Sequence, residues 1–275
     1  MLRHLFGFPV ELQSCPDLRF VLRYGPVFSV TAHPESGCLA FGVDNLQHGR
    51  LLIRYAGAGL PGGPSPAEAI RRLQHAMPVY ERLYTHPALI RLQGHGPAAD
   101  GYAAIFLLPN GVPMEGAVLE QALRLPLLSR LRMIDRIFDF HAFAAAQGVL
   151  SVGFSLPALW ADCATAEITL ADIDLYRPLP SRNDWGRMPG NSRFLSPEEY
   201  ELGAPLDTWT MQYTMGALAF ALFAGHADRE RGAWTAGEAL YQVASRACSE
   251  ERGDRYPSYD AFLLAWRAAA GETVP

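Results

Sequence analysis

A change in hydrophobic periodicity near residue 109 constrains the fold more than any other feature of the sequence. Between Leu18 and Tyr55, apolar residues recur at short intervals and are interrupted by glycine-containing turns, which predicts a three-stranded antiparallel meander. From Pro126 to Gln147 the apolar spacing is helical, and from Met211 to Phe223 the sequence is apolar on every side, as in a buried helix. Together these patterns predict an α+β fold, with a β-rich part followed by a mainly helical part.

The β-rich part is expected to span residues 18–108, as a small antiparallel sheet of five strands with one helix. Ser65-Pro66 offers a cap and a first-turn proline, and apolar residues then follow at spacings of three and four, which predicts a helix. The residues on its predicted apolar face are Ile70, Leu73, Met77, Tyr80 and Tyr84. Two further strands are predicted at Ala88–Leu92 and Tyr102–Leu108.

The helical part is expected to span residues 109–270. The apolar face of its first long helix is predicted to consist of Leu131, Ile134, Ile137, Phe138 and His141. Gly148 is a helix stop, Ile168–Asp172 predicts a short strand, Ser181–Phe194 a polar loop, and Ala233–Ala270 two more helices. The 275 residues are therefore predicted to form a single domain of two lobes.

Composition excludes several classes of partner and site. All 23 basic residues are arginine, and the net charge of −5 argues against a nucleic-acid surface. The cysteines lie far apart, which indicates buried thiols rather than a zinc or redox site. They are Cys15, Cys38, Cys163 and Cys248. The longest apolar run, Met215–Gly225, has 11 residues, whereas a membrane-spanning helix needs about 20, so no membrane association and a cytoplasmic location are expected.

Three strings in the C-terminal half resemble motifs of protein kinases. Ser196-Pro197-Glu198, 24 residues beyond Asp172, resembles the Ala-Pro-Glu motif that closes a kinase activation segment. Tyr213-Thr214-Met215-Gly216 resembles the Trp-Ser-Leu-Gly string of the buried central helix, and Asp254-Arg255-Tyr256-Pro257-Ser258 resembles the later Asp-x-Arg-x-Ser string. This resemblance to the protein-kinase-like superfamily, bacterial Ser/Thr kinases included, runs from about Leu18 to Arg267 and implies a bilobal fold. It also implies a buried salt bridge between Glu198 and Arg255.

In the β-rich part, the resemblance implies a phosphate contact. Leu51-Leu52-Ile53-Arg54 resembles Val-Ala-Ile-Lys, whose lysine holds the nucleotide phosphates. Arg54 stands at the lysine position, with a solvent-facing arginine as the alternative. The acidic partner of that lysine falls near Met77, so Glu81, four residues later and on about the same helix face, is the candidate substitute, with a surface role as the alternative. No GxGxxG precedes this strand, which predicts a weak grip on nucleotide.

Asp172 is the strongest candidate for a metal ligand. Ala171-Asp172-Ile173-Asp174 resembles the Asp-Phe-Gly motif, whose aspartate binds magnesium. Asp174 replaces the glycine, and acids at positions i and i+2 of an extended segment face the same side. The resemblance thus implies ATP with Mg²⁺ or Mn²⁺ as ligands. The alternative is that these loop carboxylates cap backbone N–H groups.

The catalytic loop departs from the kinase pattern. Gly148–Phe154 aligns with the stretch that ends in His-Arg-Asp, which places Gly153 at the catalytic aspartate and Ala158 near the metal-binding asparagine. Neither residue can orient a hydroxyl group or bind a cation. Asp162 is the nearest carboxylate downstream and a weak substitute for the missing aspartate, and Met211 replaces the central-helix aspartate that braces the loop.

Three functions are compatible with the sequence. The first is a catalytically degenerate kinase-like protein, a pseudokinase, that acts as a regulatory or binding module for another protein through its nucleotide cleft or through the loop Asp174–Phe194. This loop contains residue types that are frequent in interface hot spots, namely Arg177, Arg182, Arg187, Arg193 and Trp185. The second is an active atypical Ser/Thr protein kinase or small-molecule phosphotransferase that uses ATP and a divalent metal. The third is a structural or other non-kinase protein whose resemblance to kinases is accidental.

Overall fold

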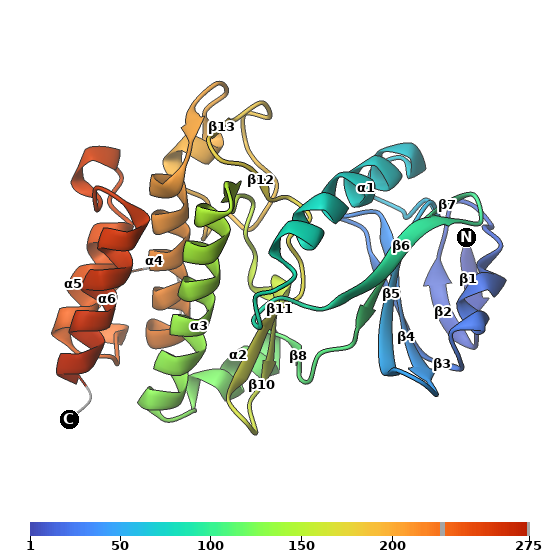
Figure 1. The fold of residues 1–275 in the computed structure, drawn as a ribbon, viewed down its shortest axis with the longest axis horizontal. Helices are drawn as coiled ribbons and strands as arrows, with labels where there is room; N and C mark the ends of the chain where they lie inside the picture. Colours follow the sequence, from blue (N-terminus) through green and yellow to red (C-terminus); the bar gives the residue numbers. More distant parts are fainter. Residues whose placement is uncertain (226–228, 274–275) are drawn as a thin grey trace. The chain divides into compact units, whose positions relative to one another are not determined.

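The structure, a computed structural model, describes residues 1–225 and 229–273 and has the predicted α+β class. The chain divides into two compact units. Unit 1 consists of Met1–Thr85 and Ile90–Leu108, and unit 2 consists of His86–Leu89 and the residues from Pro109 onward. Figure 1 shows that most of the sheet structure belongs to unit 1 and most of the helical structure to unit 2.

Unit 1 is built on a five-stranded antiparallel sheet with the strand order β3-β4-β5-β7-β6. Its strands are β3 (Val27–His33), β4 (Cys38–Asn45), β5 (Gly49–Ala56), β6 (Leu92–Ala98) and β7 (Gly101–Leu107). The first three form the predicted meander. Helix α1 (Pro66–Leu83) begins as predicted after Ser65, whose hydroxyl oxygen accepts the N–H of Glu68. Tyr84 lies just beyond α1 and is 71% exposed, so it is not part of the apolar face, contrary to the prediction.

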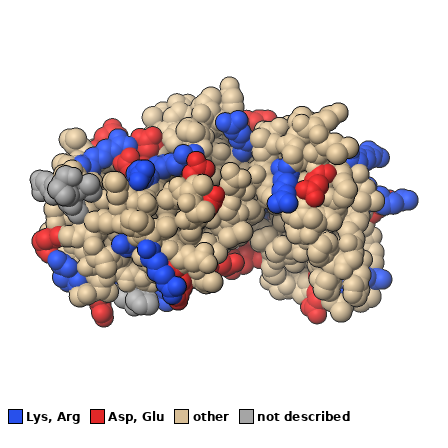
Figure 2. Space-filling model, turned by 90° about the horizontal axis from the view of Figure 1, so that it is seen from below, with Lys and Arg blue, Asp and Glu red and all other residues tan. Residues whose placement is uncertain are grey.

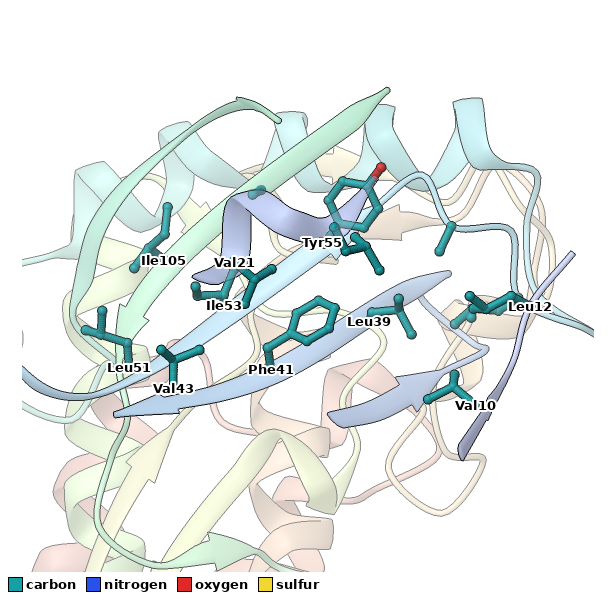
Figure 3. Packing of buried hydrophobic residues seen from close by; sticks show 14 residues of the cluster. Val10, Leu12, Val21, Leu39, Phe41, Val43, Leu51, Ile53, Tyr55 and Ile105 are labelled. Carbon is teal, nitrogen blue, oxygen red and sulfur yellow. The ribbon is translucent and has the colours of Figure 1, made fainter. Parts of the chain in front are cut away.

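The two faces of this sheet are covered by different parts of unit 1, because side chains alternate along each strand. On one face, Tyr80 of α1 packs against Phe106 of β7, with ring centroids 5.1 Å apart. The hairpin of β1 (Leu2–Leu5) and β2 (Phe8–Glu11) covers the other face together with the 3-10 helix Leu18–Arg23 (Figures 1 and 3). The core between them includes Val10, Leu12, Val21, Leu39, Phe41, Val43, Leu51, Ile53 and Ile105 (Figure 3).

The structure corrects the predicted start of the first strand. Leu18–Arg23 is a 3-10 helix, and β3 begins only at Val27. Asp17 caps this helix by accepting the N–H of Arg19 (3.1 Å), and Leu18 and Val21, three residues apart, are both buried. The apolar residues of Leu18–Arg23 fit a strand and a short helix equally well. The cap by Asp17 favours the helix. The hairpin of β1 and β2 is not predicted by the sequence at all.

The predicted strand at Ala88–Leu92 is also wrong. This segment is a buried connection in which Leu89 makes an isolated bridge with Leu170. The strand that pairs with β7 is β6, which begins at Leu92 and lies at the edge of the sheet. Edge strands tolerate glycine and proline, and β6 contains two glycines and Pro97. Its composition is therefore typical of a turn, although its exposure alternates as in a strand.

Unit 2 has a core of helices. They are α2 (Gly116–Leu123), α3 (Leu127–Ala146), α4 (Thr208–Ala224), α5 (Glu238–Ala247) and α6 (Tyr259–Thr273). Figure 1 shows α3 and α4 side by side, with α5 and α6 packed against them. As predicted, α4 is buried on all sides from Thr210 to Phe223. The predicted apolar face of α3 is buried, and the helix ends shortly before Gly148, whose φ of 71° suits a helix stop.

Short strands connect these helices. They are β8 (Val112–Pro113), β9 (Val149–Leu150), β10 (Leu159–Asp162), β11 (Glu167–Leu170), β12 (Arg177–Pro178), β13 (Ser181–Arg182) and β14 (Pro205–Leu206). β10 and β11 form a hairpin, so the strand predicted at Ile168–Asp172 is present but ends at Leu170. Among the described residues, no helix is both long enough and apolar enough to cross a bilayer.

Replacing Phe41 by alanine tests the core of unit 1. Its side chain is completely buried between the sheet and the N-terminal hairpin, so Phe41→Ala should lower the free energy of unfolding by about 3 to 5 kcal/mol in chemical denaturation. The control is Leu46→Ala, since Leu46 is fully exposed and its loss should change stability by no more than about 0.5 kcal/mol. Equal effects of the two substitutions would contradict this packing.

Candidate functional site

Arg54 lies in the middle of the sheet of unit 1 and is only 6% exposed. It pairs across β4 and β7 with Ala40 and Ala104, so small residues flank it on both sides. Its guanidinium donates to the hydroxyl of Tyr80 on α1, at 3.4 Å. Arg54 is therefore a buried cation on the α1 face of the sheet, which excludes the solvent-facing alternative.

Glu81 does not form the predicted pair with Arg54. The carboxylate of Glu81 instead contacts Nε2 of His95 on β6, at 2.9 Å. The other ring nitrogen of His95 contacts the hydroxyl of Tyr102. Glu81 directly follows the buried Tyr80, and one residue turns a helix by about 100°. Its side chain is therefore 58% exposed at the rim of α1, as in the surface alternative.

Asp172 and Asp174 occupy a tight turn directly after β11. Asp172 Oδ1 accepts the N–H of Asp174 at 2.9 Å, while Ile173 between them is buried. Asp172 thus performs the capping role that the sequence left as an alternative. Both aspartates are half-buried.

Gly153 occupies a position that no side chain fits. Its φ of +65° is left-handed, and a Cβ atom there would lie 2.6 Å from both the carbonyl oxygen of Pro189 and Cδ1 of Leu175. Its N–H donates to Oε1 of Glu199 at 2.9 Å. The local backbone is thus built around glycine, and the position aligned with the catalytic aspartate has no room for a carboxylate.

The other residues at catalytic-loop positions also have structural roles. Asp162 lies at the turn end of the β10-β11 hairpin, where Oδ1 accepts the N–H groups of Ala164 (2.9 Å) and Thr165 (3.4 Å). The hydrogen bond from Ala164 holds the pKa of Asp162 below its usual value. Asp162 is therefore a turn cap, at the opposite end of the β10-β11 hairpin from Asp172. Ala158 and Met211 are buried.

Glu198 and Arg255 form the predicted buried ion pair. Arg255 binds both carboxylate oxygens, at 2.7 and 3.1 Å, and its side chain has no exposed surface. Arg252 adds a second contact to Glu198 at 2.9 Å and binds Asp207, the N-cap of α4, at 2.7 Å. Burial raises the pKa of Glu198, but the hydrogen bonds and charge of Arg255 outweigh it, so the pKa lies below its usual value. Glu198 is therefore ionised at neutral pH.

Glu199, next to it, is not among the site residues predicted from the sequence. Its carboxylate is fully buried and accepts hydrogen bonds from Gly153 N (2.9 Å), Ser196 N (2.8 Å) and Ser196 Oγ (3.0 Å). Burial raises its pKa to about 7, against the lowering effect of these hydrogen bonds. A sequence signal exists, because Ser196 and Glu199 have the Ser-x-x-Glu spacing of a capping box, and both of its reciprocal bonds are present.

A second buried titratable group that the sequence did not single out as a site residue is His141 of α3. Its Nδ1 donates to the carbonyl of Ile137 and its Nε2 accepts from the hydroxyl of Tyr176, both at 2.7 Å, which fixes the neutral tautomer. Burial lowers the pKa of His141 to about 4, so it stays uncharged at neutral pH. Through Tyr176 it anchors the turn that contains Asp172 and Asp174.

The loop Asp174–Phe194 is held by contacts within the loop and to the residues that follow it in unit 2. Arg177 pairs with Asp184 at 2.7 Å and stacks on Trp185, and Arg187 stacks on the ring of Tyr200. Arg182 donates to the carbonyl of Gly203 at 2.9 Å. On the face of the molecule drawn in Figure 2, arginine and acidic side chains form small scattered groups, and no basic side chains gather into one extended surface there.

The sequence matches no protein-family model, and a comparison with curated proteins found no similar sequence. The resemblance to kinases therefore depends on the sequence motifs described above. Of the predicted site residues, the structure brings together Glu198 and Arg255 in one contact and Asp172 and Asp174 in one turn. It does not bring Glu81 to Arg54, and it places Asp162 away from Asp172.

The buried ion pair can be tested by removing its cation. Arg255→Ala leaves the Glu198 carboxylate buried with the half-buried Arg252 as its cation and the hydroxyl of Thr210 as a neutral donor, so the free energy of unfolding should fall by about 3 to 5 kcal/mol. Arg267→Ala is the matched control, because Arg267 pairs with Asp135 and Asp139 on the surface and should cost about 1 kcal/mol or less. A small effect at Arg255 would show that the pair does not stabilise unit 2.

Introducing an aspartate at position 153 tests the shape of the loop. Gly153→Asp must displace Pro189 and Leu175, so it should cost about 1 to 3 kcal/mol more than the same change at Gly186. Gly186 is the control because its φ of +74° is similarly left-handed, but a Cβ atom added there would meet nothing within 4 Å beyond its chain neighbours. Chemical denaturation of both variants separates the effect of crowding at position 153 from that of backbone strain. Equal losses of unfolding free energy in the two variants would show that position 153 is not crowded.

Proposed function

We propose that this chain is a catalytically degenerate kinase-like protein, a pseudokinase, that acts as a regulatory or binding module and retains the ability to bind ATP. A bilobal kinase-like fold is part of the proposal. Its support is the five-stranded antiparallel sheet with α1 in unit 1, the helical core of unit 2, and the ion pair between Glu198 and Arg255 that the kinase resemblance implies.

The geometry at Gly153 carries the degenerate part of the proposal. The left-handed backbone, the nearby Pro189 carbonyl and the hydrogen bond to Glu199 leave no space for the side chain that would orient a substrate hydroxyl. In phosphoryl transfer the protein contributes mainly positioning and charge stabilisation, so the loss of such a group lowers the rate by orders of magnitude. Asp162, the nearest substitute in sequence, is engaged in a hairpin turn.

ATP binding is supported by the chemistry of two side-chain groups. Arg54 is a buried cation suited to phosphate, although its planar guanidinium differs from a lysine ammonium. Asp172 and Asp174 offer one or two carboxylates, a number that suits Mg²⁺ or Mn²⁺ when phosphate oxygens and water complete the coordination. Bound ATP would supply those phosphate oxygens. Glu81 is not among the proposed nucleotide-binding residues, because its carboxylate is paired with His95.

A protein partner is proposed for the loop Asp174–Phe194. Arginine and aromatic side chains are the types most enriched in interface hot spots, and here Arg187 lies over the exposed Tyr200. Neither nucleic acid nor a membrane is proposed as a partner. The chain has a net charge of −5, and its arginines are spread along the sequence instead of being concentrated in one basic segment.

Thermal unfolding in the presence of ATP tests the nucleotide part. ATP with Mg²⁺ or Mn²⁺ at a hundred times its dissociation constant should stabilise the protein by about 2.7 kcal/mol and raise its melting temperature. Asp172→Ala should abolish the metal-dependent part of the shift. Asp162→Ala removes the aspartate at the turn of the preceding β10-β11 hairpin, and this control should retain the metal-dependent shift. If no condition produces a shift, the chain does not bind ATP and the nucleotide part of the proposal fails.

A further inference from the structure

Residues 182–193 and 196–203, here called the loop surface, are joined by hydrogen bonds at the N-terminal end of α4 (Figure 1). Asn183 is only 1% exposed, and its Nδ2 donates to the carbonyl of Glu198 at 3.1 Å. Its backbone carbonyl accepts the N–H of Gly203 at 2.7 Å. The two segments therefore form one ordered surface, which loses less conformational entropy on binding than a loop without such contacts.

Three large apolar side chains of the loop surface are exposed to solvent. The exposed fractions are 39% for Trp185, 43% for Tyr200 and 70% for Leu202. The guanidinium of Arg177 lies over the Trp185 ring, 5.6 Å from its centroid, and that of Arg187 lies over the Tyr200 ring at 5.8 Å. Aromatic rings beside arginines are the residue types concentrated in interface hot spots, and covering the exposed apolar area would stabilise a complex.

The loop surface also contains three exposed arginines, Arg182, Arg187 and Arg193. Within the residues that the structure describes, no carboxylate pairs with any of the three. Arg182 donates instead to the carbonyl of Gly203 at 2.9 Å, and Arg187 donates to the carbonyl of Met188 at 3.3 Å. Backbone carbonyls leave the positive charge of both side chains without a compensating negative charge.

The acidic side chains of the loop surface compensate this charge only in part. Asp184 is paired with an arginine at 2.7 Å, Glu198 is held in its buried ion pair, and Glu199 is fully buried. Glu201 is exposed and has no cation as a partner in the described part of the chain. Three unpaired arginines thus face one unpaired carboxylate, on a chain whose net charge is −5.

We propose that the loop surface binds an acidic peptide segment of a partner protein, whose carboxylates contact the three arginines and whose apolar side chain packs on Trp185, Tyr200 and Leu202. Arginine binds carboxylates through paired hydrogen bonds, and the charge of such a segment complements that of the surface. The apolar side chain is part of the proposal because exposed ion pairs alone contribute little. The inference rests on the proposed function, which assigns a protein partner to the loop Asp174–Phe194, and it adds the chemistry of that partner.

Selection from a library of short random peptides displayed on phage identifies the chemistry that the full chain binds. The selected peptides are sorted by whether they still bind the double variant Trp185→Ala with Leu202→Ala, which should keep the wild-type fold because both side chains are exposed. Peptides that fail to bind this variant depend on the loop surface. They should be enriched in aspartate and glutamate around an aliphatic or aromatic residue.

Fluorescence anisotropy with a labelled synthetic copy of the most enriched of these peptides then measures the role of charge. Arg187→Gln with Arg193→Gln should weaken binding about fivefold or more, because two ion pairs are lost. Arg124→Gln with Arg132→Gln is the matched control, since it also neutralises two exposed arginines of unit 2 outside the loop surface, and it should change the affinity less than about twofold. Raising the ionic strength from about 0.05 M to about 0.5 M should weaken binding by the wild type.

The outcomes separate this inference from the proposed function. If the peptides that depend on the loop surface are neutral or basic, the acidic partner is overturned, whereas a protein partner at the loop remains. Equal weakening by the two double arginine variants would also overturn it, because the attraction would then come from the charge of the whole chain. If no selected peptide depends on the loop surface, the protein partner assigned to the loop fails as well, while ATP binding is decided separately by the thermal unfolding experiment.

Discussion

The buried charge of Glu198 is the constraint on which much of unit 2 depends. A carboxylate with 4% of its side chain exposed is tolerable only when cations and hydrogen-bond donors surround it. Arg255 binds both oxygens and also donates to backbone carbonyls of Ser249 and Trp209, while Thr210 adds a hydroxyl. These contacts join the Ser196–Tyr200 turn, the start of α4 and the segment before α6. The position of that turn in turn fixes Glu199, and through it the loop around Gly153.

This arrangement gives two adjacent acids opposite electrostatic environments. Glu198 has arginine partners and a lowered pKa, whereas Glu199 has neutral donors and a pKa raised to about 7. One acid stabilises the scaffold, and the other holds the loop around Gly153. The Gly153 amide donates to the Glu199 carboxylate of the Ser196–Tyr200 turn, while Met211 of α4 is part of the buried core.

The sequence predicts the parts of the structure that local patterns determine. The meander of β3 to β5 and the helices α1, α3 and α4 follow from periodicity. The pair of Glu198 with Arg255 is implied only by the resemblance to kinase motifs. The wrong predictions concern segments whose structure depends on contacts outside the local pattern. The cap by Asp17 makes Leu18–Arg23 a 3-10 helix instead of a strand. β6 is a strand despite its glycines because it lies at the edge of the sheet. At the site, helix rotation places Glu81 beside His95, and the role of Glu199 depends on a contact 46 residues away in sequence.

We propose that this chain has a kinase-like fold and does not transfer phosphate from ATP. The most direct measurement is ADP formation by the purified chain with saturating ATP and Mg²⁺ or Mn²⁺, compared with buffer and with Asp172→Ala. The proposed function predicts ADP formation at the rate of the buffer control in both proteins. ADP formation by the wild type that exceeds this rate and is abolished by Asp172→Ala would contradict it and would identify an active phosphotransferase.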